Sequence, residues 1–61
     1  MNKVVEILMR RDGISEEEAL EAIQDCREQM LYFCARGDYS MAEDCITEEL
    51  GLEPDYIFDI L

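Results

Sequence analysis

Apolar residues recur every three or four positions along most of the chain, a spacing typical of helices that bury one face. The pattern is interrupted near each of the three glycines and again at the single proline. No segment alternates between apolar and polar residues over a useful length, so no strand is expected. The spacing predicts one small all-α domain over residues 1–61. It is a bundle of four helices built on an antiparallel helical hairpin, at about 2–11, 15–36, 40–50 and 54–61.

Residues that favour helix ends stand at the borders of these segments. Ser15 and Glu18 form a capping box, in which each side chain satisfies a free backbone N–H group. The third helix is expected to begin at Asp38 or Ser40, and Ser40 with Glu43 predicts a second capping box. Pro54 is favoured at the first position of a helix, and the glycines can adopt the left-handed conformation that ends one.

The segment 15–36 is the longest, and we expect the other helices to pack on it. Its expected apolar face consists of Ala19, Leu20, Ile23, Cys26, Met30, Phe33 and Cys34, widened by Leu31 and Tyr32. The shorter segments are expected to contribute Val4, Val5 and Leu8, then Ala42, Cys45, Ile46 and Glu49 or Leu50.

The chain is strongly acidic, with 16 Asp and Glu, 5 Lys and Arg, no His and a formal net charge of −11. Residues 1–11 hold three basic groups and one acid, whereas residues 12–61 hold two basic groups and fifteen acids. Such a surface repels phosphate groups and anionic lipid and attracts basic surfaces. We therefore expect a protein partner with a basic surface, and no direct binding to nucleic acid or membrane.

Four acids on the long helix fall at i, i+4, i+8 and i+11 and form one continuous acidic stripe: Glu17, Glu21, Asp25 and Glu28. One interpretation is a solvated outer face. However, solvated faces usually mix charge signs, because like charges at i, i+4 cost a few tenths of a kcal/mol each. The second interpretation is therefore a binding surface for a cationic partner, and both remain open.

The C-terminal segment is apolar on most sides and also has two interpretations. Part of it must cover the hairpin core. The remaining side chains could form an apolar patch for a partner or for a second copy in a homodimer: Tyr56, Ile57, Phe58 and Leu61.

Residue types needed for common catalytic and metal sites are scarce. Histidine, the usual base near neutral pH, is missing, so we expect no enzyme activity. The odd cysteine count, without CxxC spacing, does not match a zinc site, and we expect no metal or cofactor. Cys26, Cys34 and Cys45 are expected to be buried and reduced, which suits a cytoplasmic protein. The N-terminal apolar stretch is too short for a signal peptide or a membrane span.

Two resemblances add context. In residues 37–56, six positions follow the second half of a tetratricopeptide-type helical hairpin: Gly37, Ala42, Ile46, Leu50, Leu52 and Pro54. The upstream helix departs from that family's pattern, so the resemblance implies an αα-hairpin binding scaffold. The segments Arg11–Ala19, Gly37–Asp44 and Leu50–Tyr56 also resemble short acidic uncharacterised proteins of phages and mobile elements of Gram-positive gut bacteria.

These observations predict a non-catalytic acidic protein-binding module. Its sharpest form is a phage or mobile-element protein that occludes the basic nucleic-acid-binding surface of a host defence protein. The alternative is a small homo-oligomeric or adaptor protein that uses its apolar C-terminal helix, with the charge serving only solubility.

Overall fold

The structure, a computed structural model, describes residues 2–60 and is all-α, with no strand in that range, as predicted. Its elements are α1 (Lys3–Asp12), α2 (Glu16–Ala35), α3 (Tyr39–Cys45), the π-helical turn η1 (Ile46–Leu50), the 3-10 turn η2 (Pro54–Tyr56) and α4 (Ile57–Ile60). Within residues 2–60, no helix has the length and hydrophobicity that a membrane crossing requires.

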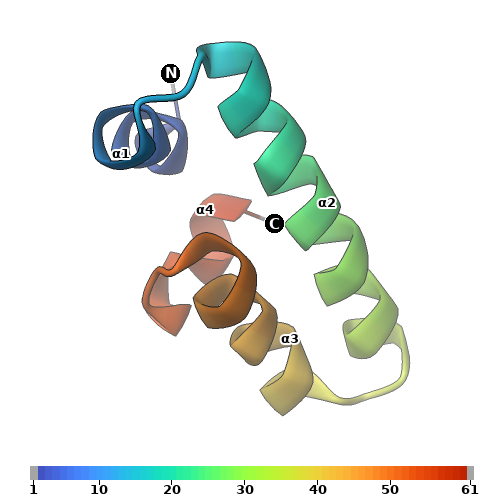
Figure 1. Ribbon diagram of the computed structural model, residues 1–61. Coiled ribbons are helices and arrows are strands. Elements are labelled where there is room, and N and C mark those ends of the chain that lie inside the picture. The colour runs from blue at the N-terminus through green and yellow to red at the C-terminus, as the bar shows by residue number, and fades with distance from the viewer. Residues whose placement is uncertain (1, 61) are drawn as a thin grey trace.

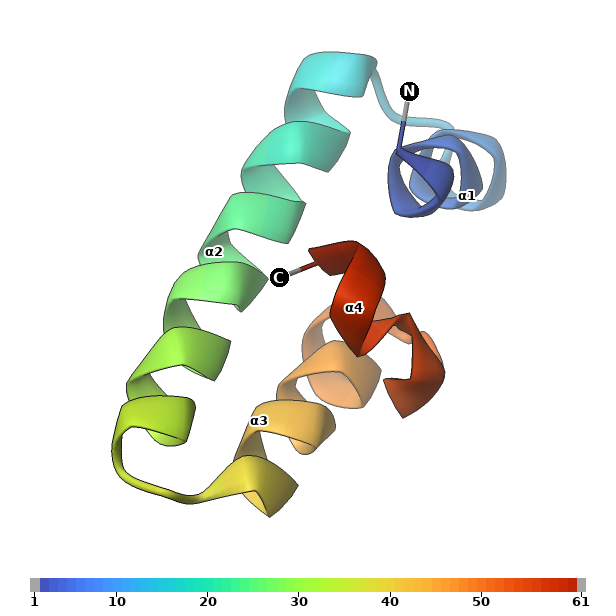
Figure 2. The same cartoon turned by 180° about the vertical axis from the view of Figure 1, so that it is seen from behind.

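The long helix α2 organises the molecule. The elements α1, α3 and α4 all lie on one side of it, in both views (Figures 1 and 2). A turn after α2 reverses the chain, and α3 runs back in the opposite direction to complete the predicted hairpin (Figure 1). Gly37 in this turn has φ 77°, a left-handed conformation that side chains disfavour.

The core is apolar throughout, and no described residue with a polar or charged side chain is buried. On α2 the buried seam consists of Ala19, Ile23, Cys26 and Met30. The other elements cover it with Val4, Val5, Leu8, Ala42, Cys45, Ile46, Leu50, Leu52 and Ile60. These elements therefore share one core rather than forming separate clusters.

The two ends of the described chain are tied together. Asn2 caps α1 by accepting a hydrogen bond from the Val4 backbone N–H at 2.7 Å. Its amide nitrogen also donates to the carbonyl oxygen of Asp59, again at 2.7 Å. The Lys3 ammonium lies 5.7 Å from the centroid of the Tyr56 ring. Local capping and long-range contacts therefore fix the short C-terminal turns against α1.

The first predicted capping box is confirmed and the second is wrong. Ser15 accepts from the Glu18 backbone N–H, and its own backbone N–H donates to the Glu18 carboxylate, both at 3.1 Å. At α3 the N-cap is Asp38, whose carboxylate accepts from the Met41 backbone N–H at 3.2 Å. The helix therefore begins at Tyr39, and Ser40 lies inside its first turn rather than at its cap.

Three expected apolar positions on α2 are also wrong. Leu20 is 49% exposed, Leu31 is 50% exposed and Tyr32 is 57% exposed. The two leucines lie eleven residues apart, about three helical turns, and so share a face beside the buried seam. All neighbouring elements pack on one side of α2, so no described element covers the face of the two leucines. The last predicted helix, 54–61, begins with a 3-10 turn, and its final residue lies outside the described range.

We expect the loss of Asp38 to lower the free energy of unfolding more than the loss of Ser40. The predicted Ser40–Glu43 capping box implies the reverse order. Asp38→Ala removes the cap and should lower the free energy of unfolding by about 1 kcal/mol. Ser40→Ala should leave it nearly unchanged. Urea unfolding followed by circular dichroism measures both, and a larger loss for Ser40→Ala would contradict this assignment.

Candidate functional site

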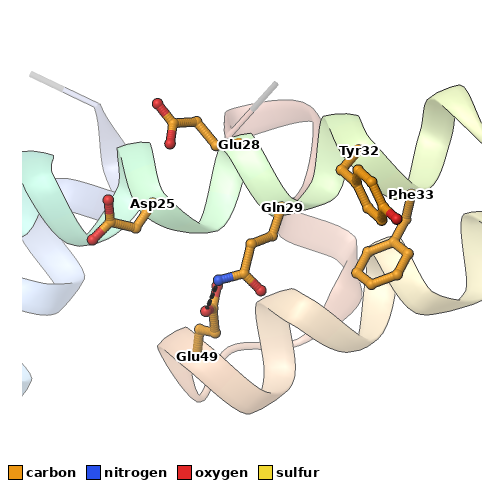
Figure 3. Close-up of a pocket in the computed structure, with 6 residues that line it drawn as sticks. All are labelled: Asp25, Glu28, Gln29, Tyr32, Phe33 and Glu49. Carbon is orange, nitrogen blue, oxygen red and sulfur yellow. Dashed lines mark hydrogen bonds between the residues drawn. The ribbon is translucent and has the colours of Figure 1, made fainter.

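A groove of about 530 Å³ lies between α2 and η1 (Figure 3). Its lining combines three carboxylates, one amide and two aromatic rings: Asp25, Glu28, Gln29, Tyr32 and Phe33 from α2, and Glu49 from η1. We call it the α2–η1 groove.

The middle of this groove is bridged by one hydrogen bond. Gln29 points from α2 toward η1, and its amide nitrogen donates to the Glu49 carboxylate (Figure 3). Nearby on α2, Glu28 accepts from the Gln24 side-chain amide at 3.3 Å. Two of the three carboxylates are thus held by neutral donors, which orient them without cancelling their charge.

The aromatic end of the groove is built by adjacent residues of α2. The Tyr32 and Phe33 rings have centroids 5.3 Å apart and an interplanar angle of 77°, an edge-to-face arrangement. Tyr32 is 57% exposed. The Arg36 guanidinium carbon lies 5.5 Å from the Tyr32 ring centroid, and Arg36 donates to the Tyr32 hydroxyl at 3.3 Å. This end already holds one guanidinium on an aromatic ring.

No described basic side chain forms an ion pair with a groove carboxylate. Within residues 2–60 the only ion pair is the 2.9 Å contact between Arg11 and Asp12, which are neighbours in sequence on α1. The three groove carboxylates therefore line one groove and form no ion pair among the described residues. This arrangement attracts cations and repels anions.

The π-helical turn places Glu49 in the groove. A π-turn has i→i+5 hydrogen bonds, so each residue turns through a smaller angle than in an α-helix. Leu50 is buried, whereas Glu49 is exposed and contacts α2. The sequence left both residues as candidates for the buried face, and α-helical periodicity could not separate them. Such turns occur frequently at functional sites.

The groove contains only half of the acidic stripe. All four stripe residues, Glu17, Glu21, Asp25 and Glu28, are exposed as expected. Asp25 and Glu28 line the groove, whereas Glu17 and Glu21 lie nearer the N-terminus of α2 and do not. Gln29, Tyr32 and Phe33 lie outside the site residues that the sequence predicts. Each of them lies four residues after a residue of the stripe or the groove, and this i, i+4 spacing is the sequence signal that places them on the same side of α2.

The residues of the predicted apolar patch differ in their exposure to solvent. Tyr56 and Ile57 are partly buried, Phe58 is 89% exposed, and Leu61 lies outside the described residues. Phe58 and Ile57 line a second hollow of about 640 Å³, with Tyr39, Glu43, Pro54 and Asp55. Its exposed aromatic rings come from α3 and α4.

The cysteines are free thiols, and two of them belong to the core. Cys26 and Cys45 are buried and Cys34 is half-buried. Burial, with a further contribution from the nearby Glu49 carboxylate, raises the pKa of the Cys26 thiol to about 12. Burial also raises the pKa of Cys45. At neutral pH both thiols are protonated and therefore poor nucleophiles. No cluster of potential metal ligands occurs in residues 2–60.

No family model, curated protein or solved structure matches the chain. The resemblance to short acidic phage and mobile-element proteins therefore stays a prediction.

We expect the free energy of unfolding to fall as the pH rises above about 9, the ordinary pKa of a thiol. Between that value and about 12 the unfolded chain loses the Cys26 proton, whereas the folded chain keeps it. Urea unfolding below and above pH 9 measures this effect. Cys26→Ala should show a weaker pH dependence than Cys34→Ala, and equal dependence in the two variants would contradict the assignment.

Proposed function

We propose that this chain is a non-catalytic protein-binding module that docks on the basic surface of a protein partner. The observation that carries the proposal is the α2–η1 groove, where three carboxylates that form no ion pair among the described residues meet the exposed Tyr32 ring and the partly buried Phe33 ring. Protein interfaces are enriched in aromatic residues, and complementary charge steers association. The absence of histidine and the protonated buried thiols support a non-catalytic role.

The partner we propose is a nucleic-acid-binding protein of a host cell, such as a defence nuclease. Such proteins carry basic grooves that bind phosphates, and an acidic module seated there would exclude the nucleic acid. A phage or mobile-element origin fits this role. The module needs no cofactor for it, because occlusion requires only tight, charge-complementary docking.

Salt and charge reversal should both weaken capture of the partner. We expect proteins captured from a bacterial lysate by the immobilised chain to be lost as salt rises from about 50 to 200 mM. Reversing Glu17, Glu21 and Asp25 to lysine should abolish capture at low salt. Captured proteins identified by mass spectrometry should include a DNA- or RNA-binding protein, and adding the acidic chain should release its nucleic acid.

A matched control separates local charge from total charge. Reversing Glu6, Asp44 and Glu53 to lysine changes the net charge equally, at exposed positions away from α2. This variant should retain most of the capture. A capture profile insensitive to salt and to both sets of reversals would overturn the proposed function.

A second candidate function is favoured by the 89% exposure of Phe58. An aromatic ring left this open beside a hollow lined by Tyr39 and Ile57 is suited to bury apolar surface against a second copy or an adaptor partner. In this case the charge would serve solubility only.

If the second candidate is right, Phe58→Asp should convert a dimer to a monomer. Light scattering at two protein concentrations measures the mass. Gln24→Asp adds the same charge at an exposed site on α2 and should leave the dimer intact. Truncation after Glu53 is less informative, because it also removes the buried Ile60. A wild-type chain that is monomeric at both concentrations would exclude homo-oligomerisation.

A further inference from the structure

We propose that the α2–η1 groove binds an arginine side chain of the basic partner. This inference rests on the proposed function and adds the identity of the group that the partner inserts. The guanidinium of the arginine would stack on the aromatic end formed by Tyr32 and Phe33 and pair with the groove carboxylates.

The acidic stripe alone is too sparse to compete with a nucleic acid. Its four carboxylates span eleven residues, about 16 Å along the helix axis. Duplex DNA carries one charge per about 1.7 Å of axis, or roughly ten charges over the same length. Competition on a basic surface therefore needs an anchor that contributes more than charge. The groove is the feature next to the stripe that has concave shape and apolar surface.

The chemistry of the lining favours arginine over lysine. A guanidinium has five N–H donors in a planar fork that pairs with carboxylates through two parallel hydrogen bonds, and it stacks on aromatic faces. A lysine ammonium is a strongly hydrated point charge with no planar face. The groove supplies both features that distinguish the two groups, with carboxylates from Asp25, Glu28 and Glu49 and the rings of Tyr32 and Phe33.

The chain itself shows that this aromatic end accepts a guanidinium. Arg36 places its guanidinium over the Tyr32 ring and donates to the Tyr32 hydroxyl. Among the described residues no ion pair involves Arg36, so this contact does not depend on a carboxylate. An incoming arginine would compete with Arg36 for the Tyr32 ring, and it would also pair with the groove carboxylates.

One carboxylate of the groove is also held in place before a ligand binds. The Gln29 amide holds the Glu49 carboxylate, so less side-chain entropy is lost when a cation binds there. The groove volume of about 530 Å³ falls within the range of roughly 300–1,000 Å³ that is usual for ligand sites. It can accommodate a long side chain and part of the neighbouring backbone.

The test compares fluorescein-labelled hexa-arginine and hexa-lysine peptides, which carry equal charge. Fluorescence anisotropy at one salt concentration should show hexa-arginine binding at least about fivefold more tightly. The groove variant Asp25→Asn with Glu49→Gln should abolish this preference. The stripe variant Glu17→Gln with Glu21→Gln loses the same charge and should weaken both peptides equally, so that the preference remains.

The possible outcomes separate this inference from the proposed function. Equal binding of the two peptides, or a preference that survives in the groove variant, would overturn the arginine pocket and leave the basic-partner proposal standing. Binding of neither peptide, even at low salt, would overturn both. If the groove variant does not fold, amide chemical shifts of the wild-type chain decide. Hexa-arginine should perturb Gln29, Phe33 and Glu49 more than Glu17 and Glu21, and the reverse order would exclude the pocket.

Discussion

The structure depends on one seam of apolar contacts along α2. Ala19, Ile23, Cys26 and Met30 are buried at i, i+4, i+7 and i+11, and α1, α3 and η1 all contact this helix. A chain of this size can build only one such core. Because every covering element lies on the same side, the rest of α2 stays open to solvent. Because α2 buries only one face, its other faces expose the two leucines, the acidic stripe and the aromatic end of the groove.

The same arrangement concentrates charge. All the described acids remain outside the core, and the one ion pair lies on α1, away from most of them. Carboxylates that are crowded in this way repel one another and reduce the stability of the folded chain. A partner that supplies cations would remove part of this repulsion and stabilise the folded state through binding. The self-repulsion and the proposed affinity for a basic surface would thus both follow from one charge distribution.

Most of the fold could be predicted from the sequence, because helix periodicity and helix-ending residues act locally. Ser15 with Glu18, the glycines and the seam on α2 identified the elements and much of the core. Where two nearby residues can each serve the same structural role, the sequence could not predict which of them does. Asp38 and Ser40 can each cap α3, and only the path of the turn decides. The groove was missed for a related reason, since it forms where a π-turn brings Glu49 against Gln29, twenty residues earlier.

Glu49 connects the groove to the core. Its carboxylate receives the Gln29 hydrogen bond at the surface, and its charge also contributes to the raised pKa of the buried Cys26 thiol. The same group therefore faces solvent on one side and acts on the apolar seam on the other. An acid in this position would be better accommodated beside a cation than alone, because a cation offsets its repulsion of Asp25 and Glu28. The stripe has no equivalent, since among the described residues no side-chain hydrogen bond or ion pair joins Glu17 or Glu21 to another element. This difference makes the groove, rather than the stripe, the better candidate for specific recognition.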